Sequence, residues 1–448
     1  MLTSQLIVLR PGAHHDALRD LAVYRREGRL AKGMARDVRF FIDGWRLSPP
    51  VDALWLPRAL LPRAQRIVPL RVFDATRTVE EIDFGWRGEL RPEQAEAVGR
   101  LYGQGGGMLI APPAAGKTES GMALLACWRQ PALWMVHTKD LVNQAVERAQ
   151  RVLSLPRGGI GIIGAGHKDT WGTHLTVATI QSLTRKRYAE EAGIGAVVWD
   201  EAHHAGALSF ARVLNRLPAR FRVGLTATPD RTDGLHPLIY DLFGPAVTIP
   251  YATMVALGRA LVPSVEQLNT KFQASPGADW NQIQEERARD AHRNLMICAL
   301  AFGLWRSGHR VIVLVERIEH TKVLAEALQA RFGCPTSAVS GPVVALARKQ
   351  AFGALSTDRR VLVATKLMDE GVDIPLADRL ILGAAQRSEP LLWQRVGRVI
   401  RAPEGKTDAV VWDLVDPLVP SLLDQAQQRE GVYRALGFPV RRHAGSVA

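Results

Sequence analysis

The sequence predicts an α/β protein: two tandem domains, each a parallel sheet flanked by helices, behind a small N-terminal α+β domain. The prediction rests on three features. Short, almost continuously apolar runs alternate with amphipathic helical segments, as expected for parallel strands buried on both faces. The pattern occurs in two blocks, and a stretch rich in Pro, Gly and Thr (245–276) separates them. A chain of 448 residues can bury a core in each of two or three domains.

The expected strands define the domain boundaries. The apolar runs are 108–110, 133–136, 160–163, 175–178, 196–199 and 222–225 in the first block, and 311–315, 336–339, 361–364, 379–382 and 409–412 in the second. We therefore expect an N-terminal accessory domain over 1–85, a first α/β domain over 86–250, a second over 251–435, and a loose basic tail over 436–448.

The N-terminal segment is the least regular part of the chain. Short β-like runs at 5–9, 38–42 and 67–73 and a helix over 16–26 are predicted. Many arginines lie near Trp45 and Trp55, and such interleaving can bind a nucleic-acid backbone and stack bases. In the alternative interpretation the arginines form a solvated face and the tryptophans belong to the core. The sequence leaves both interpretations open.

The amino-acid composition indicates which class of binding partner and which cellular compartment to expect. Lys and Arg outnumber Asp and Glu to give a net charge of +13, which favours a polyanionic partner such as nucleic acid. The three cysteines, Cys127, Cys298 and Cys334, have no ligand spacing, which argues against structural zinc or disulfides. No apolar run is long enough to span a membrane, and the first ten residues make a poor signal peptide. A cytoplasmic location is expected.

Residues 111–118 (APPAAGKT) predict a phosphate-binding loop, because small residues here join an apolar strand to a helical segment. Such a loop lets backbone N–H groups surround a polyphosphate at the helix N-terminus. The expected cradle is formed by Pro113, Ala114, Ala115 and Gly116. Lys117 would contact the β- and γ-phosphates, and the Thr118 hydroxyl would ligate Mg²⁺. Ala111 replaces the usual first Gly, and this is compatible with the turn if its φ is negative.

A second group of candidate residues follows the run 196–199, where the strand ends in Asp200-Glu201. Asp200 is expected to be the outer partner of Mg²⁺, and Glu201 to orient and deprotonate the attacking water. The adjacent His203-His204 pair could suggest zinc, but no further Cys or His set has ligand spacing.

With these residues in place, the chain resembles superfamily 2 nucleic-acid-dependent ATPases, the helicases and translocases built from two RecA-like domains. The matching segments, in order, are Arg91 with Gln94 (adenine-reading motif), 111–118 (motif I), 137–138 and 179–183 (backbone contacts), 200–203 (the DEAH form of motif II), 225–229 (motif III), 340–341 with 364–375 (motifs IV to V) and 394–401 (motif VI). The resemblance covers about 88–415 and implies ATP and Mg²⁺ as cofactors.

The resemblance also implies roles for further residues. Coupling of hydrolysis to movement is expected from His203, Thr226, Thr228 and Gln394, nucleotide contacts from Gly371 and Asp373, and nucleic-acid contacts from Thr138, Thr179 and Thr365. Single threonines are also common helix caps, and the two roles can coexist. Arg398 and Arg401, expected on one face of a helix, would bring positive charge to the γ-phosphate from the second domain.

The residue order in motifs III and V indicates which branch of superfamily 2 the chain resembles. TATPDRTDG at 226–234 and DEGVDIP at 369–375 resemble the XPB-like and phage UvsW-type DNA helicases. The DEAH spelling also occurs in RNA-remodelling enzymes, but those carry large C-terminal domains, and few residues follow Arg401 here. We therefore expect a monomeric, ATP-dependent DNA helicase or translocase acting on duplex, forked or branched DNA in repair, recombination or replication. The alternatives are an RNA helicase and an ATP-gated clamp that does not unwind.

Overall fold

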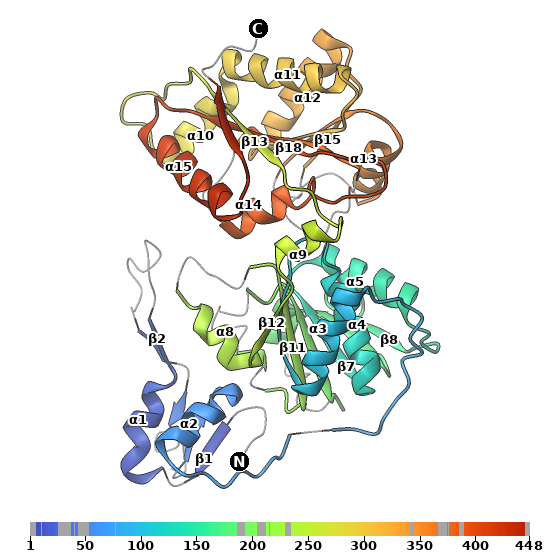
Figure 1. Ribbon diagram of the computed structural model, residues 1–448, viewed down its shortest axis with the longest axis vertical. Coiled ribbons are helices and arrows are strands. Elements are labelled where there is room, and N and C mark those ends of the chain that lie inside the picture. Colours follow the sequence, from blue (N-terminus) through green and yellow to red (C-terminus); the bar gives the residue numbers. More distant parts are fainter. Residues whose placement is uncertain are drawn as a thin grey trace. The chain divides into compact units, whose positions relative to one another are not determined.

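The computed structural model describes residues 6–9, 11–25, 37–39, 41–43, 53–76, 78–185, 193–203, 212–214, 216–228, 234–340, 345–365, 374, 376–384 and 389–443. The chain divides into two compact units, Met1–Pro250 and Tyr251–Ala448 (Figure 1). Across these ranges no helix combines the length and the hydropathy needed to cross a bilayer.

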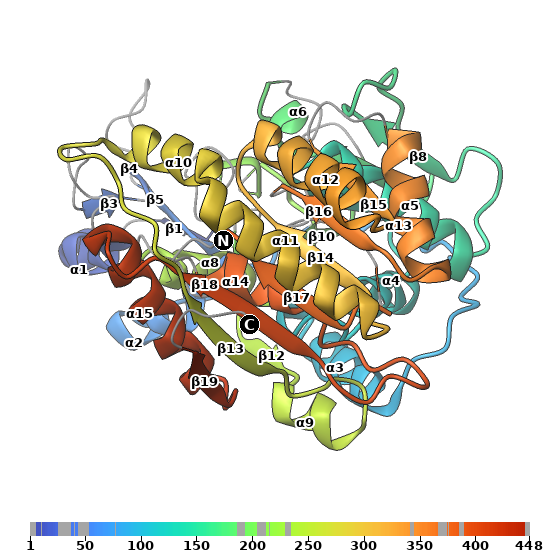
Figure 2. The same cartoon turned by 90° about the horizontal axis from the view of Figure 1, so that it is seen from above.

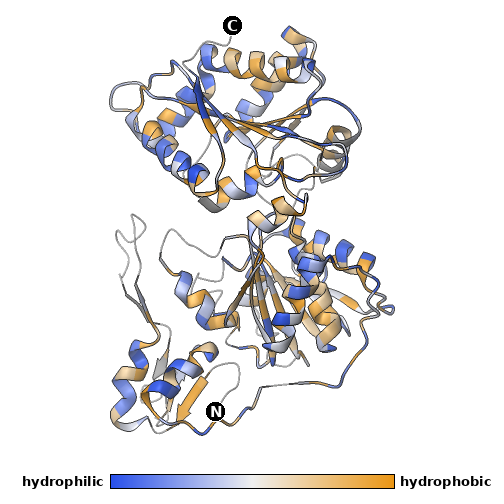
Figure 3. Ribbon diagram, viewed as in Figure 1, coloured by the Kyte–Doolittle hydropathy of each residue, from blue (hydrophilic) through white to orange (hydrophobic). Residues whose placement is uncertain are grey.

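The first unit is built on a seven-stranded parallel sheet with the order β12-β6-β11-β10-β7-β9-β8. Its strands are β6 (Gly106–Ile110), β7 (Ala132–Val136), β8 (Ile160–Ile163), β9 (Leu175–Thr179), β10 (Ala196–Asp200), β11 (Phe221–Thr226) and β12 (Ala246–Thr248). They contain the apolar runs predicted for this block, and Figure 3 shows them as hydrophobic ribbons. Because the pairings are parallel, all carboxyl ends lie at one edge of the sheet.

Helices cover both faces of this sheet. The helices are α3 (Pro92–Gly103), α4 (Lys117–Trp128), α5 (Lys139–Val152), α6 (Ile180–Arg185) and α8 (His236–Phe243). Helices α3, α4 and α5 pack on one face, and α8 packs on the other (Figure 1). The expected βα alternation of a doubly covered parallel sheet is confirmed.

The N-terminal segment forms a small α+β module. It contains β1 (Leu6–Leu9), α1 (His15–Asp20), β2 (Val23–Arg25), β3 (Asp37–Arg39), β4 (Ile42–Asp43), β5 (Ala53–Leu56) and α2 (Leu61–Ile67). Two local predictions were wrong. The helix expected over 16–26 ends at Asp20 and a strand follows, while 67–73 forms no strand because α2 extends to Ile67 and Pro69 lacks a backbone donor.

This module shares a hydrophobic core with the first unit instead of enclosing one of its own. Leu18, Leu54 and Leu60 belong to the same buried cluster as Leu238 and Ile239 of α8. Polar contacts add to this packing. They are Tyr24 Oη to Asp241 Oδ2 (2.8 Å) and the Arg58 guanidinium to the carbonyls of Ala219 (2.8 Å) and Arg220 (2.9 Å). Trp55 is half-buried in β5, and Trp45 lies outside the described residues.

The second unit is also built on a seven-stranded parallel sheet, with the order β15-β16-β14-β17-β18-β13-β19. Its strands are β13 (Ser264–Asn269), β14 (Val311–Leu314), β15 (Thr336–Val339), β16 (Val361–Ala364), β17 (Arg379–Leu382), β18 (Val410–Val415) and β19 (Val440–His443). The prediction of a loose tail was wrong for 440–443, because this stretch pairs with β13 as an edge strand. Residues 444–448 lie outside the described residues.

Helices again cover both faces. They are α9 (Tyr251–Ala256), α10 (Trp280–Arg289), α11 (Ala291–Arg306), α12 (Ile318–Phe332), α13 (Ala345–Thr357), α14 (Glu389–Val396) and α15 (Pro420–Ala435). Figure 1 shows α11 and α14 on opposite faces of this sheet, and Figure 2 shows α12 and α15 on either side of its central strands. The predicted pair of RecA-like domains is confirmed by the two helix-covered parallel sheets.

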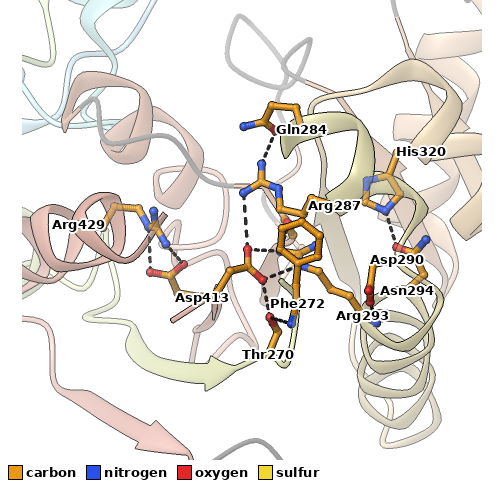
Figure 4. A network of polar contacts seen from close by, with 12 residues as sticks. Thr270, Phe272, Gln284, Arg287, Asp290, Arg293, Asn294, His320, Asp413 and Arg429 are labelled. Carbon is orange, nitrogen blue, oxygen red and sulfur yellow. Dashed lines mark hydrogen bonds and ion pairs between the residues drawn. The ribbon is translucent and has the colours of Figure 1, made fainter. Parts of the chain in front are cut away.

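Buried charges anchor the helices of the second unit to its strand ends (Figure 4). Asp416, which follows β18, accepts hydrogen bonds from Arg293 Nε (2.8 Å) and from Thr270 Oγ1 (2.5 Å). The Arg429 guanidinium of α15 donates to both oxygens of Asp413 (3.0 and 2.7 Å). Burial by itself would raise the pKa of Asp416, but Arg293 and Arg287 hold it below its ordinary value. Each buried charge is thereby compensated.

Candidate nucleotide and nucleic-acid sites

The predicted motifs of the first unit gather at one edge of its sheet. Strand β6 leads into the loop 111–116, β10 ends at Asp200, β11 ends at Thr226, β7 precedes Thr138, and β9 ends at Thr179. The register places Asp200 beside Leu225 and Thr226 beside Ile110. In parallel α/β sheets ligands bind at this carboxyl edge. The fold therefore brings motifs I, II and III together.

The phosphate loop has a strained turn. Helix α4 begins at Lys117, and its N-cap, Gly116, has a left-handed φ of 76°. Ala114 also has a positive φ, 71°, whereas Ala111 does not, as the variant motif required. A left-handed alanine costs roughly 1 kcal/mol, and strain of this kind concentrates at functional sites. Lys117 Nζ donates to the carbonyl of Ala111 (3.2 Å), so the loop holds its own lysine.

Arg91 and Gln94 hold this loop by hydrogen bonds to its backbone carbonyls. Gln94, only 3% exposed, donates from Nε2 to the carbonyl of Ala115 (2.9 Å). The Arg91 guanidinium donates to the carbonyl of Ala114 (3.1 Å). A Cβ added at Gly116 would lie 2.0 Å from Gln94 Nε2, so glycine is required there by contact as well as by φ. The sequence predicts that Arg91 and Gln94 recognise the adenine base, and this stays a prediction. It did not predict that the two side chains hydrogen-bond to the phosphate loop.

The acidic pair lies beside the loop at the end of β10. The backbone N–H of Glu201 donates to Asp200 Oδ1 (3.0 Å), and Glu201 has a positive φ of 53°. This backbone conformation is strained for a non-glycine residue and turns the chain sharply after the strand. Burial, reinforced by the negative charge of Glu201, raises the pKa of the Asp200 carboxyl, and Lys117 acts in the opposite direction.

A buried histidine connects motifs II and III. His203 Nδ1 lies 3.2 Å from Thr226 Oγ1 and 3.3 Å from Glu201 Oε2. Thr226 Oγ1 also donates to the carbonyl of Thr228 (2.9 Å) and accepts from the N–H of Thr228 (3.2 Å). The three residues predicted to couple hydrolysis to movement (His203, Thr226 and Thr228) therefore form one hydrogen-bonded chain, and its histidine lies within ion-pair distance of Glu201. His204 and 229–233 lie outside the described residues.

The site fits a divalent cation held mainly by a nucleotide. Among the described residues, no group of three or more His, Cys, Asp and Glu could hold a metal alone. The raised pKa of Asp200 indicates that the surrounding protein does not fully compensate its buried charge. Mg²⁺ is commonly bound by one or two carboxylates with phosphates and waters. Asp200 and the half-buried Thr118 fit that pattern.

The three threonines predicted to contact nucleic acid all follow strands. Thr138 caps α5, accepting from the N–H of Leu141 (3.4 Å), as expected for a threonine at this position. The Thr179 hydroxyl bonds with Ser182 Oγ (2.8 Å), and Thr365 is only 4% exposed. Buried hydroxyls have little surface to offer a phosphate. Nucleic-acid contact at these positions stays a prediction, with the neighbouring backbone as its main donor.

Motif VI differs from the prediction. Helix α14 carries Gln394 but ends at Val396, and the chain then turns through Arg398. Arg401 lies in a short antiparallel bridge with Ala260. The two arginines are therefore not on one helical face, because backbone pairing with the segment 259–261 replaces the helix. Gly371 and Asp373, predicted to contact nucleotide, lie outside the described residues.

Comparison with known proteins identifies two family domains in the chain. Residues 87–231 match the family model of the type III restriction enzyme res subunit, and residues 292–403 match the helicase conserved C-terminal domain. The chain belongs to superfamily 2 of the helicases. Within it, the chain is similar to the XPB-like DNA helicases.

Individual helicase relatives extend over most of the chain. The DNA 3′-5′ helicase XPB of Kineococcus radiotolerans is 29% identical and matches 72% of this chain and 58% of its own. The DNA 3′-5′ translocase XPB2 of Sulfurisphaera tokodaii is 25% identical, over 70% of this chain and 79% of its own. For three further helicase relatives, the chain spans only 55%, 61% and 52% of their length.

Solved structures share the helicase fold. The DNA-bound type ISP restriction-modification enzyme LlaBIII superposes with a TM-score of 0.61 at 16% identity, covering 81% of this chain and 32% of its own. At this level of identity the likeness concerns the fold, and it supports the assignment of two tandem RecA-like domains.

Proposed function

We propose that this superfamily 2 helicase couples ATP hydrolysis to translocation on DNA, with unwinding or branch migration as the result. The observation that carries the proposal is the meeting of the Lys117 loop, Asp200-Glu201 and the His203–Thr226 contact at one sheet edge. A loop that only bound nucleotide would need neither a strained glutamate beside the γ-phosphate position nor a buried link to motif III.

The proposed chemistry uses side chains at that edge. Lys117 and the loop N–H groups hold the β- and γ-phosphates, and Thr118 with Asp200 would hold Mg²⁺. The cation would neutralise phosphate charge. A carboxylate oxygen of Glu201 accepts a proton from a water whose oxygen attacks the γ-phosphorus, and the bond from that phosphorus to the bridging oxygen breaks to release ADP. Arg91 and Gln94 are proposed to read adenine while they hold the loop.

The second unit is proposed to supply the remaining catalytic residues. Arg398 and Arg401 are proposed to neutralise charge that develops on the γ-phosphoryl group, a role that contributes about 10³- to 10⁵-fold in related enzymes. Gly371 and Asp373 are proposed to contact the nucleotide, and Gln394 to sense its hydrolysis. Hydrolysis would then depend on domain closure, and alternating closure and opening would move a bound strand.

DNA is proposed as the nucleic acid along which the protein translocates. The net charge of +13 suits a polyanion, and the two XPB relatives are named as enzymes acting on DNA with 3′-5′ polarity. By this likeness we propose 3′-to-5′ movement, with Thr138, Thr179 and Thr365 lying along the backbone path. An RNA track and an ATP-gated clamp are the competing functions.

One assay separates these functions. ATP turnover is measured without nucleic acid and with poly-uridine, single-stranded DNA, a forked duplex and a four-way junction, and strand separation is followed on the last two. The proposal expects DNA-stimulated turnover and unwinding or migration, both abolished by Lys117→Ala. Stimulation by RNA alone would indicate an RNA helicase, and tight DNA binding with ATP but without turnover would indicate a clamp.

A further inference from the structure

The turn that carries the motif VI arginines is held in part by contacts outside the motif. Beyond the end of α14 at Val396, turn bonds to the carbonyls of Arg395 and Val396 hold the chain from Arg398 to Ile400, and no regular helix continues to Arg401. Val399 and Ile400 between the two arginines are fully buried. The direction in which the arginines project therefore depends on what binds the backbone of this turn.

One side of the turn is fixed by the segment that follows α9. The N–H of Leu261 donates to the carbonyl of Ile400 (2.7 Å), and the N–H of Ala402 donates to the carbonyl of Arg259 (3.3 Å). These two bonds flank the bridge between Ala260 and Arg401. The segment 259–261 thus adds a short antiparallel strand to motif VI.

The other side is fixed by a lysine. Lys406 Nζ donates to the carbonyl of Val399 (2.6 Å) and to the carbonyl of Ala377 (2.6 Å). Ala377 follows the motif V segment, so a single ammonium bridges the backbone of motif VI and the backbone of the segment after motif V. A tight turn places this lysine. The N–H of Lys406 bonds to the carbonyl of Pro403 (3.1 Å), and Gly405 takes the required positive φ of 82°.

Burial of the Lys406 ammonium disfavours its charged form. Burial lowers its pKa to about 8, while the carboxylates of Asp378 and Asp408 act in the opposite direction. Those carboxylates have other partners as well, since Asp408 pairs with Arg379 (2.8 Å) and Asp378 with His309 (3.0 Å). A partly desolvated ammonium bonded to two carbonyls is an arrangement suited to fixing backbone.

We propose that Lys406 is a positioning residue for ATP hydrolysis, which ties motif VI to the segment that follows motif V, so that Arg398 and Arg401 are presented in a catalytic direction. The inference rests on the proposed function. Lys406 acts through the carbonyl of Val399, and its loss misplaces the arginines while leaving the phosphate loop of the first unit intact.

The test compares Lys406→Met with Lys322→Met, a control that removes an exposed lysine paired with Glu319 on the surface of α12. We expect Lys406→Met to lower the DNA-stimulated kcat at least about 10-fold, since small misplacements of catalytic groups cost up to about 10². The KM for ATP should stay within about threefold, and Lys406→Arg should recover part of kcat. Hydrogen exchange at the N–H groups of Leu261 and Ala402 should accelerate in Lys406→Met only.

The outcomes separate the two proposals. If the wild-type chain lacks nucleic-acid-stimulated ATPase, the proposed function fails and the inference fails with it. If the wild type is active and Lys406→Met keeps kcat within twofold, the inference alone is overturned. It is also overturned if kcat and ATP affinity fall together, or if hydrogen exchange at Leu261 and Ala402 is unchanged.

Discussion

His203 Nδ1 lies 3.2 Å from Thr226 Oγ1, and this contact connects the ends of two neighbouring strands, β10 and β11. The same nitrogen lies 3.3 Å from Glu201 Oε2. A change of charge at Glu201 during hydrolysis therefore has a direct path, through one imidazole, to the motif III segment. Both side chains of the contact are buried, so water competes little for it.

Removal of the Thr226 hydroxyl is predicted to uncouple hydrolysis from movement. Thr226→Val keeps the shape but loses the oxygen that bonds to His203 and Thr228. We expect unwinding to fall about fivefold, because a buried hydrogen bond is worth roughly 1 kcal/mol, while single-turnover ATP hydrolysis falls less than about twofold. Thr226→Ser, which keeps the hydroxyl, is the matched control. Equal losses of both activities in Thr226→Val would contradict the coupling role.

Gln94→Glu is predicted to weaken ATP binding. The carboxylate cannot donate to the carbonyl of Ala115 and places negative charge against the loop that holds phosphates. The KM for ATP should rise about 10-fold, as read from steady-state ATPase. Gln104→Glu, the same change at an exposed position just beyond α3, serves as the control and should have little effect. An unchanged KM in Gln94→Glu would show that the loop does not depend on this support.

We expect the protein to lose stability in acid because His320 is buried in its neutral form. Burial, with the positive charges of Arg293 and Arg287, lowers its pKa to about 3, and its Nε2 bonds to Asn294 Oδ1 (2.7 Å). The unfolded chain takes up the proton near pH 6.5 and the folded chain does not. Stability is therefore complete above pH 6.5 and falls as pH drops towards 3, by roughly 3 kcal/mol between pH 6.5 and 4.

The measurement is urea unfolding at both pH values, with hydrogen exchange in α12 to locate the change. His320→Gln removes the titrating group but can still donate to Asn294, so its acid destabilisation should be much smaller. His292→Gln replaces an exposed histidine of α11 and should behave as the wild type. The prediction fails if the wild type and His320→Gln lose the same stability.

Tyr24→Phe tests the attachment of the N-terminal module. The change removes the hydroxyl that donates to the buried carboxylate of Asp241, and Arg63 at 3.4 Å compensates only in part. We expect a loss of about 1–2 kcal/mol, together with faster hydrogen exchange in β1 and β5. Tyr102→Phe, at a side chain 53% exposed on α3, is the control. Unchanged exchange in Tyr24→Phe would mean that apolar packing alone holds the module.

The sequence predicted six of the seven strands of the first unit, because each predicted apolar run lies within one strand, but it did not predict β12. The phosphate loop and the Asp200-Glu201 pair could be placed from those runs alone. Contacts between distant segments could not. Nothing local in Gln94 indicates that its amide lies beneath Gly116, and nothing in Lys406 indicates a bond to Val399.

Elements with weak local patterns were also missed. The stretch 440–443 is rich in basic residues and becomes a strand only because β13 offers it an edge. The turn after α14 reads as helix through Arg401, but pairing with 259–261 and the following Pro403 end the helix early. In each case a long-range backbone pairing outweighs local propensity.

The most direct test of this account is a rapid-quench measurement on Glu201→Gln with saturating forked DNA. If Glu201 removes the proton from the attacking water, ATP should bind within about threefold of the wild-type Kd, while the hydrolysis step slows about 10²- to 10⁴-fold. Hydrolysis of bound ATP at close to the wild-type rate would contradict the assignment of Glu201 and, with it, the catalytic site described for the first unit.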